Sequence, residues 1–262
     1  MSSTISSHAI APANVLRGSG AWGEALPLIA ELCQKPFVLG RSGATAELRQ
    51  TLSSDLAATG LSVAAGELEF DCCEQDLQRL AAEITASGCD AVLAAGGGKV
   101  LDAGKLLADR LGLPCITVPT SAATCAGWTA LANIYSAQGA FEGDVALRHC
   151  PELLIFDHDL VAQAPARTLA SGIADAMAKW YEASVSSGSS SDGLVQQAVQ
   201  QARVLRDQLL LEGLEAIEQP GGEAWQRVAE ASGLTAGLIG GIGGARCRTV
   251  AAHAVHNGLT QL

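Results

Sequence analysis

The chain has 262 residues, 48% of them hydrophobic and 16% charged, which excludes disordered and fibrous proteins and suffices for one large or two small domains. Arg, Asp, Gln or Glu breaks every apolar run before it reaches the roughly 18 residues that span a bilayer. The net charge is −11, and the 16 Lys and Arg residues are scattered, whereas a nucleic-acid surface needs clustered basic residues. We therefore expect a soluble protein that binds a small molecule, and neither a nucleic acid nor a membrane.

The cysteines and the N-terminus indicate a reducing compartment. The eight cysteines form no CxxC pair and are too sparse for a disulfide scaffold. The N-terminal sequence MSSTISSHAIAPANV lacks a basic segment followed by an apolar one, as a signal peptide would have. Free thiols and a cytoplasmic location are expected.

Short apolar runs alternate with amphipathic stretches from residue 36 to about residue 160. The stretches between the runs predict helices over 44–58, 73–87 and 100–111. Strand–helix alternation implies right-handed βαβ units and a parallel sheet, with ligands at the carboxyl ends of its strands. We expect an α/β domain over 1–160. Its buried strands are predicted at 37–40, 61–70, 91–97, 114–120 and 152–156.

The pattern after residue 160 is helical throughout, which predicts a second, all-helical domain over 161–262. Loop signals separate the predicted helices at 187–193, 219–222 and 240–245. The chain stops at Leu262 inside a predicted helix, without a Gly cap, a Pro or a polar tail. We therefore expect this domain to be incomplete and truncated at its C-terminus. The predicted helices are 167–184, 193–217, 223–239 and 246–262.

The first Gly-rich stretch is a literal GxGxxG, formed by Gly18, Gly20 and Gly23. A dinucleotide fingerprint must join a strand to a helix and be followed about 20 residues later by an acidic residue. Here the preceding run is only NVLR, and the downstream position falls on Gly40 and Arg41. We interpret the stretch as a glycine turn before a helix that begins near Gly23.

The second Gly-rich stretch, AAGGGKVLDAGK (94–105), places glycines 96–98 between a predicted strand and a predicted helix. Glycines let backbone N–H groups approach an anion, and the N-terminus of a helix attracts negative charge. The stretch is not a P-loop, because Leu93 and Val100 occupy positions that need Gly and Ser or Thr. Taken alone, it is compatible with a phosphate site and with a plain tight turn.

Four ordered stretches carry a family resemblance: GGGKxxDxxK, VPTSAATCAGWTAL (118–131), SGIADAMAKWYEA (171–183) and AAHAVHNGLT (251–260). Together they resemble the iron-containing (group III) alcohol dehydrogenases, and within them the glycerol dehydrogenase-like and hydroxycarboxylate dehydrogenase-like branch. The similarity extends from about residue 8 to the end of the chain. It implies a dinucleotide-binding α/β domain, a helical metal-binding domain, and an active site in the cleft between them.

The resemblance also implies which residues bind the cofactor, NAD(H) or NADP(H). The pyrophosphate is expected on Gly97, Gly98 and Lys99, with Asp102 on the following turn of the helix near the cofactor. The nicotinamide side would be lined by Thr120, Thr129, Leu131 and Tyr135.

In the family, one Asp and His residues from separate helices hold a divalent metal, and Asp175 and His253 match them. A carboxylate and a neutral imidazole suit zinc or iron, which polarises the substrate oxygen so that a hydride can move. Without the resemblance, Asp175 can also be an ordinary helix residue paired with Lys179 at i+4. His256 lies on nearly the same helical face as His253 and is a candidate second ligand from that helix, whereas the resemblance places it beside the site. The family's next ligand would lie past Leu262, so we expect the chain to hold its metal weakly.

One departure from the family pattern concerns the substrate. Glycerol dehydrogenases have Asp where this chain has Cys125, so a carboxylate that could accept a polyol hydroxyl is missing. The CAxWT pattern resembles a sub-branch that reduces 2-oxo acids, and an uncharged lining tolerates an anionic substrate better than one with Asp. Cys125 can also be a small buried hydrophobe.

A second departure concerns the cofactor. NAD-preferring relatives carry Asp after the Gly that ends the first predicted strand, and this chain has Arg41 there. Asp accepts the ribose hydroxyls and repels a 2′-phosphate, whereas Arg41 with Ser42 can bind that phosphate, which favours NADP(H). A solvated Arg in a loop is the alternative.

Two hypotheses of different classes follow. The first is a metal-dependent oxidoreductase that transfers a hydride between NAD(P)H and a small 2-oxo or 2-hydroxy acid, with glycerol or another polyol as the alternative substrate. The second is a catalytically silent nucleotide-binding fragment that lacks the third metal ligand. For the enzyme we expect a homo-oligomer with one divalent metal per chain.

Overall fold

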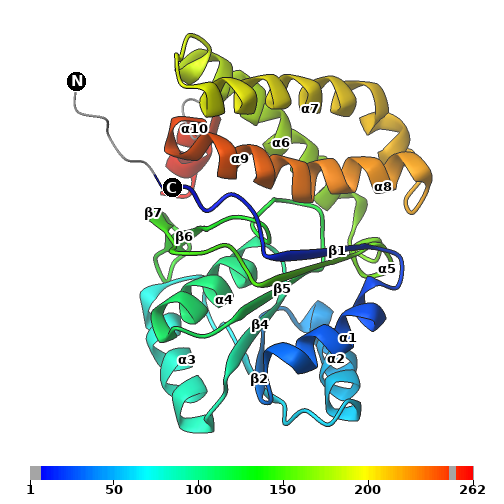
Figure 1. Ribbon diagram of the computed structural model, residues 1–262, viewed down its shortest axis with the longest axis vertical. Coiled ribbons are helices and arrows are strands. Elements are labelled where there is room, and N and C mark those ends of the chain that lie inside the picture. Colours follow the sequence, from blue (N-terminus) through cyan, green and yellow to red (C-terminus); the bar gives the residue numbers. More distant parts are fainter. Residues whose placement is uncertain (1–6, 248–251, 262) are drawn as a thin grey trace.

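The computed structural model describes residues 7–247 and 252–261 and contains the parallel sheet that the sequence predicts (Figure 1). Six strands pair in the order β1-β8-β5-β4-β2-β3, and all neighbours run parallel. The strands are β1 (Asn14–Gly18), β2 (Pro36–Gly40), β3 (Ala64–Glu67), β4 (Ala91–Gly96), β5 (Cys115–Pro119) and β8 (Leu153–Asp157).

The inner strands are almost entirely apolar because helices cover both faces of the sheet. Every residue of β2, β4, β5 and β8 is buried, as expected for parallel strands covered on both sides. β3 is an edge strand in which half-buried and exposed residues alternate, and it occupies only part of the predicted stretch 61–70. The five predicted strands are confirmed. β1, which lies outside the predicted set, adds a sixth strand at the other edge.

Two pairs of helices cover opposite faces of this sheet. α1 (Ala21–Leu32) and α2 (Ala46–Ala58) pack on one face, and α3 (Glu74–Ser87) and α4 (Gly98–Leu111) pack on the other. The connection after β2 leads to β3, and the connection after β4 leads in the opposite direction to β5. Such a reversal leaves a crevice at the carboxyl ends of the two strands, where nucleotides bind in sheets of this order.

A two-stranded antiparallel sheet, β6 (Leu131–Tyr135) and β7 (Phe141–Ala146), lies outside the predicted elements. Lys105 of α4 anchors it: the ammonium, on a side chain only 2% exposed, donates to the carbonyl oxygens of Thr129 (3.0 Å) and Leu131. A buried ammonium needs such acceptors. The sequence conceals this hairpin because its strands are short, and because a distant side chain holds it in place.

The rest of the chain is helical and lies above the sheet in Figure 1. The helices from α5 to α9 share one buried cluster, which also includes Ala122, Cys125, Leu154 and Phe156 from the α/β part. A π-helical turn over Ala231–Thr235 joins α8 to α9, and a 3-10 turn over Gly244–Cys247 follows α9. The helices are α5 (His158–Val161), α6 (Ala166–Ser187), α7 (Gly193–Glu218), α8 (Glu223–Glu230), α9 (Ala236–Gly243) and α10 (Ala252–Leu259).

The expectation of a loop over 240–245 is wrong for its first part, because α9 continues to Gly243. Two glycines of α9 serve close packing instead of breaking the helix. A Cβ on Gly237 would lie 2.5 Å from Cβ of Trp128, and one on Gly241 would lie 2.2 Å from the carbonyl oxygen of Ile10. Glycine therefore lets α9 approach both segments.

The predicted fold class, a parallel-sheet α/β part followed by a helical part, is confirmed. The boundary expected after residue 160 falls inside α5, and the division into two domains stays a prediction. Across the described residues, no helix is both long and apolar enough to span a bilayer. Of the predicted helix 246–262, residues 248–251 and 262 lie outside the described residues.

Gly172→Ala in α6 is expected to destabilise the protein, because a Cβ there would lie 1.8 Å from the carbonyl oxygen of Ala122. Two backbone segments would have to separate, and overpacking of this kind costs about 1–3 kcal/mol. Gly23→Ala in α1 is the matched control, since a Cβ there meets nothing within 4 Å; replacing a helical Gly should stabilise by about 0.5–1 kcal/mol. Urea unfolding followed by circular dichroism measures both, and equal midpoints for the two variants would contradict the close contact.

Candidate functional site

The carboxyl ends of β2, β3 and β4 bring three charged residues together. Arg41 follows β2 directly, Asp71 lies between β3 and α3, and Lys99 is in the first turn of α4. The Arg41 guanidinium lies 2.5 Å from Asp71 Oδ1, and the Lys99 ammonium lies 2.5 Å from Asp71 Oδ2. The two predicted cofactor-binding cations therefore share one carboxylate, at the crevice between β2 and β4.

The glycine loop after β4 has the geometry of an anion site. Gly97 precedes α4 in an extended conformation, and no side chain among the described residues caps this helix. A Cβ on Gly97 would meet nothing within 4 Å, whereas one on Gly98 would lie 2.9 Å from Cγ2 of Thr124. Beside the loop, the buried Thr120 donates its backbone N–H to the carbonyl oxygen of Gly96 (3.1 Å). The uncapped N–H groups and the dipole of α4 favour a phosphate here.

The GSGAWG turn differs because its N–H groups are already bonded. The expectation that no strand precedes it is wrong, since β1 leads into it and α1 follows. Asp157 Oδ2 accepts from the N–H of Trp22 (2.8 Å), and Asp159 Oδ2 accepts from the N–H of Gly20 (3.1 Å). Two carboxylates at the N-terminus of α1 oppose a phosphate there.

Four further predicted cofactor residues are tied to the β6–β7 hairpin. The buried Asp102 carboxylate lies 3.1 Å from the Lys105 ammonium and accepts from the N–H of Asn133 (3.1 Å); burial raises the pKa of Asp102 although Lys105 opposes the change. Thr129 and Leu131 bind Lys105 through their carbonyl oxygens. The half-buried Tyr135 ring lies 4.6 Å from the Lys99 ammonium. Asp102 therefore holds β6 in place, and Tyr135 lies beside Lys99.

The predicted metal ligands Asp175 and His253 lie together although 78 residues separate them in the chain. Asp175 Oδ1 is 3.1 Å from His253 Nε2, and both side chains are about a quarter exposed (28% and 27%). The buried Glu182 binds His253 twice: its Oε2 lies 2.6 Å from Nδ1, and its Oε1 accepts from the backbone N–H (3.0 Å). A carboxylate that binds the second imidazole nitrogen is a recurrent feature of metal-bound His.

These residues fit a divalent cation. With its Nδ1 proton donated to Glu182, a neutral His253 presents the lone pair of Nε2 to the Asp175 carboxylate, so a proton or a cation must lie between two acceptors. Two ligands about 2.1 Å from a tetrahedral metal lie roughly 3.4 Å apart, close to the observed 3.1 Å. Among residues 7–247 and 252–261, no group of three or more His, Cys, Asp or Glu side chains is arranged to hold a metal.

The pKa shifts in this cluster follow from the same contacts. Burial acts to raise the pKa of Asp175, but the bond to His253 and the charge of Lys179 outweigh it, and the pKa is lowered. The bond to Asp175 raises the pKa of His253 against burial and the charge of Lys179. The pair is thus suited to share a positive charge.

Cys125 and His256 lie in the neighbourhood of the metal pair but differ in exposure. Cys125 is 6% exposed, and its pKa is raised chiefly by burial, with smaller effects from Lys179 and Asp175. This thiol is therefore neutral. His256 is exposed in α10, with Nδ1 3.4 Å from Oδ1 of Asn257.

Comparison with known proteins agrees with this geometry. Residues 12–158, more than half of the chain, match the family described as iron-containing alcohol dehydrogenase. The chain belongs to this family. An uncharacterized oxidoreductase of Synechocystis is 52% identical over 256 residues, which cover 98% of this chain and 66% of that protein. Hydroxycarboxylate dehydrogenase A of Escherichia coli is 39% identical over 199 residues, 73% of this chain and 54% of that protein.

A solved structure shows the same fold. The crystal structure of a probable glycerol dehydrogenase from Sinorhizobium meliloti matches with a TM-score of 0.85 and 27% identity, and the match covers 96% of this chain and 71% of that one. The chain thus spans between about half and 71% of the length of these three relatives. Membership in the iron-containing alcohol dehydrogenases implies a nicotinamide cofactor and a divalent metal, and the two clusters described above are the candidate sites.

Asp71 and Glu182 are outside the set of residues predicted from the sequence, although each left a signal. Glu182 follows Asp175 by seven residues in α6, with Lys179 between them, so all three share one helical face. Asp71 lies between Phe70 and two cysteines, just after a predicted strand and therefore at the edge where ligands bind.

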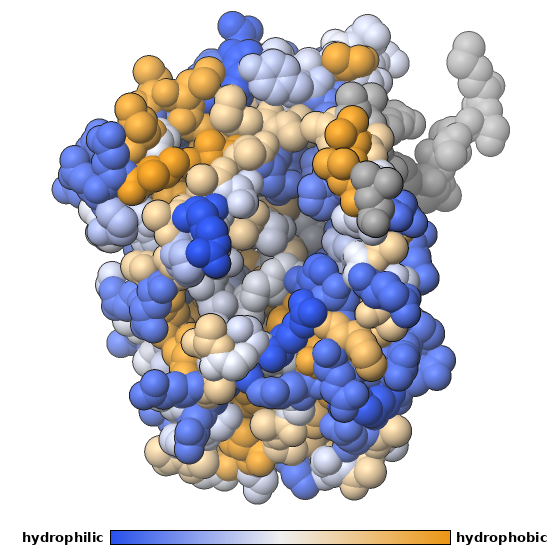
Figure 2. Space-filling view, turned by 180° about the vertical axis from the view of Figure 1, so that it is seen from behind, coloured by the Kyte–Doolittle hydropathy of each residue, from blue (hydrophilic) through white to orange (hydrophobic). Residues whose placement is uncertain are grey.

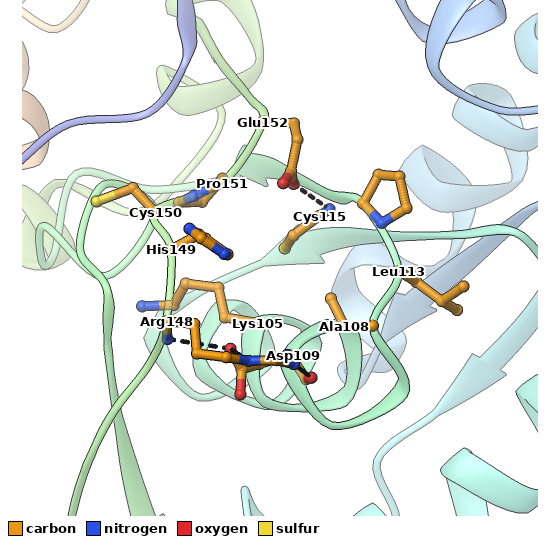
Figure 3. A pocket seen from close by; sticks show the side chains of 12 residues that line it. Lys105, Ala108, Asp109, Leu113, Cys115, Arg148, His149, Cys150, Pro151 and Glu152 are labelled. Atoms are coloured by element: carbon orange, nitrogen blue, oxygen red, sulfur yellow. Dashed lines mark hydrogen bonds and ion pairs between the residues drawn. The ribbon is translucent and has the colours of Figure 1, made fainter. Parts of the chain in front are cut away.

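A cavity of about 290 Å³ lies elsewhere, at the amino ends of β5 and β8 (Figure 3). Cys115 begins β5, and its N–H donates to Oε2 of Glu152 (2.6 Å). Lys105 and His149 also line this cavity. None of the predicted site residues lines it, so it belongs to neither cluster.

Glu182→Gln is expected to weaken zinc binding about 10–100-fold, because loss of such an orienting carboxylate typically has this effect on metal affinity. The side-chain amide of Gln has only one acceptor oxygen, so it cannot accept from both the backbone N–H and Nδ1 of His253. Titration of zinc against a chelating dye measures the affinity, with circular dichroism as a check of folding. Glu215→Gln, an exposed change on α7, is the matched control; equal zinc affinities in the two folded variants would contradict the role of Glu182.

Proposed function

We propose that the protein is a metal-dependent oxidoreductase that transfers a hydride between NADP(H) and a small 2-oxo or 2-hydroxy acid. The observation that carries the cofactor assignment is the position of Arg41. It directly follows β2 at the crevice between β2 and β4, and the uncapped glycine loop faces it from β4. A dinucleotide placed with its pyrophosphate at that loop has its adenosine ribose near the end of β2.

The chain's own residues then have separate tasks. Gly97, Gly98 and Lys99 bind the pyrophosphate through backbone N–H groups and one ammonium. Arg41 binds the 2′-phosphate that distinguishes NADP(H) from NAD(H). The segment after β5 begins with Thr120 beside the glycine loop and continues toward the metal cluster. This segment orients the nicotinamide end of the cofactor.

The metal cluster completes the proposed site. A divalent metal held by Asp175 and His253 supplies, when bound, Lewis-acid polarisation of the substrate oxygen. Glu182 holds the His253 ring in one orientation and keeps the proton on Nδ1. His256, three residues further along α10, is exposed beside the site.

The substrate assignment depends on Cys125. Its thiol is buried and neutral, so it adds no negative charge near Asp175, and a substrate carboxylate meets less repulsion there. The name of hydroxycarboxylate dehydrogenase A describes such a substrate for one relative. Glycerol is the second candidate, because the solved relative is a probable glycerol dehydrogenase.

Self-association and a cytoplasmic location are further parts of the proposal. The helical part carries apolar side chains on its surface (Figure 2). Exposed apolar patches commonly mark contacts with other chains, which is compatible with the expected homo-oligomer. The large exposed apolar residues among those described are Tyr181, Val185, Leu194, Val204, Leu210, Leu211, Leu214, Val255 and Leu259.

NADPH is expected to bind more tightly than NADH, and Arg41→Asp should reverse the preference. Hydrogen bonds to charged groups contribute about 1.5–3 kcal/mol, which corresponds to a change of roughly 10–100-fold in the ratio of the two dissociation constants. Fluorescence titration with both cofactors measures the ratio. Arg148→Asp, near the amino ends of β5 and β8, is the control. Equal affinities for the two cofactors, unchanged by Arg41→Asp, would overturn the assignment.

Cys125→Asp is expected to shift the specificity from a 2-oxo acid toward glycerol, because the new carboxylate repels an anion and can accept a polyol hydroxyl. The readout is the ratio of kcat/KM for pyruvate reduction to kcat/KM for glycerol oxidation. Cys125→Ser, which is similar in size and uncharged, should leave this ratio largely unchanged. A protein that prefers glycerol before any substitution would show that the substrate assignment is wrong.

A further inference from the structure

Asp71 lies between the two cations that the proposed function assigns to cofactor phosphates. Each oxygen of its carboxylate is 2.5 Å from one of them, Oδ1 from Arg41 and Oδ2 from Lys99. The Asp71 side chain is 8% exposed, whereas those of Arg41 and Lys99 are 40% and 39% exposed. The carboxylate is therefore fixed inside the protein, while both cations can reach the solvent from which a nucleotide arrives.

The surroundings of Asp71 keep its carboxylate in this place. Its carbonyl oxygen accepts from the N–H of Cys73 (2.7 Å), and the carbonyl oxygen of Cys72 accepts from the N–H of Tyr135 in β6 (2.9 Å). In the β6–β7 turn, Gly139 has a φ of +89°, and a Cβ there would lie 3.2 Å from Asp71 Oδ2. The hairpin thus closes over the carboxylate, and movement must come from the longer, more exposed side chains of Arg41 and Lys99.

We infer that Asp71 is a specificity-determining residue that holds Arg41 and Lys99 when no cofactor is bound, so that the cofactor phosphates must displace it. This inference rests on the proposed function. When only a fraction of the molecules is in the state that binds a ligand, the apparent affinity falls by that fraction. NADH requires release of Lys99 alone, whereas NADPH requires release of Lys99 and Arg41. Asp71 therefore weakens the binding of both cofactors and weakens that of NADPH more.

Asp71→Asn is expected to tighten NADPH binding about tenfold and NADH binding about threefold, as measured by fluorescence titration. Tenfold corresponds to about 1.4 kcal/mol. Glu69→Gln is the matched control: it removes the same charge two residues away, but Glu69 forms its ion pair with Arg79 (3.6 Å). Glu69→Gln should leave the dissociation constants of NADPH and NADH nearly unchanged, apart from the small long-range effect of removing one exposed negative charge.

Two double variants separate the contributions of the cations. In an Arg41→Ala background, Asp71→Asn should tighten both cofactors equally, because the extra gain for NADPH depends on the freed guanidinium. In a Lys99→Ala background, the gain for NADH should disappear and only the part specific to NADPH should remain. Non-additive effects of this kind identify residues that share one interaction.

The outcomes distinguish this inference from the proposed function. If folded Asp71→Asn binds both cofactors as before or more weakly, Asp71 aligns the cations instead of competing for them, and the inference is wrong while NADP(H) binding stands. If the unsubstituted protein binds neither cofactor, the proposed function is wrong, and the inference fails with it. Circular dichroism establishes folding, and Asp71→Ser, which removes the charge with a smaller side chain, provides the same comparison should Asp71→Asn not fold.

Discussion

The reversal of strand order between β2 and β4 is the constraint on which the proposed cofactor site depends. Because the helices after these two strands pack on opposite faces of the sheet, the loops that begin at Arg41 and Gly97 diverge. The N-terminus of α4 opens into that gap without a side-chain cap. At the outer edge of the same sheet, Asp157 and Asp159 occupy the N–H groups of the β1–α1 turn. The two Gly-rich turns thus differ in what already binds their N–H groups.

α6 connects this cofactor edge to the metal cluster. Gly172 lets the helix approach the carbonyl oxygen of Ala122 in the segment after β5, so a close backbone contact adds to the side-chain cluster that the two parts of the molecule share. One turn later the same helix presents Asp175, and two turns after that Glu182, which holds His253. Figure 2 shows the surface hollowed between the helical and the α/β parts. A hydride donor bound at one part and a substrate bound at the other need such a fixed separation, since hydride transfer tolerates little displacement.

Buried charge in this protein is compensated in two ways that differ in consequence. Lys105 is surrounded by Asp102 and two carbonyl oxygens, an arrangement that satisfies the ammonium completely and fixes β6. Asp71 is equally buried, but its partners are cations with exposed side chains, so they can be drawn away by a stronger anion. The first cluster is structural, and the second is able to respond to a ligand. Both clusters contain a buried carboxylate in contact with cationic side chains. They differ in the exposure of those cations, because Lys105 is buried whereas Arg41 and Lys99 are exposed.

The sequence by itself determined the parallel sheet, because buried strands between amphipathic helices leave a continuous apolar pattern, and all five predicted strands are present. It also determined the family, through ordered motifs around Lys99, Cys125, Asp175 and His253. Local pattern could not reveal the β6–β7 hairpin or the helical part of GGIGGA, since a buried ammonium and close backbone packing decide these. Nor could it pair Arg41 with Asp71 or His253 with Glu182. Such contacts join residues far apart in the chain, and only the tertiary structure decided them, because a carboxylate's partner depends on which strand ends and helix faces the fold brings within a few ångströms.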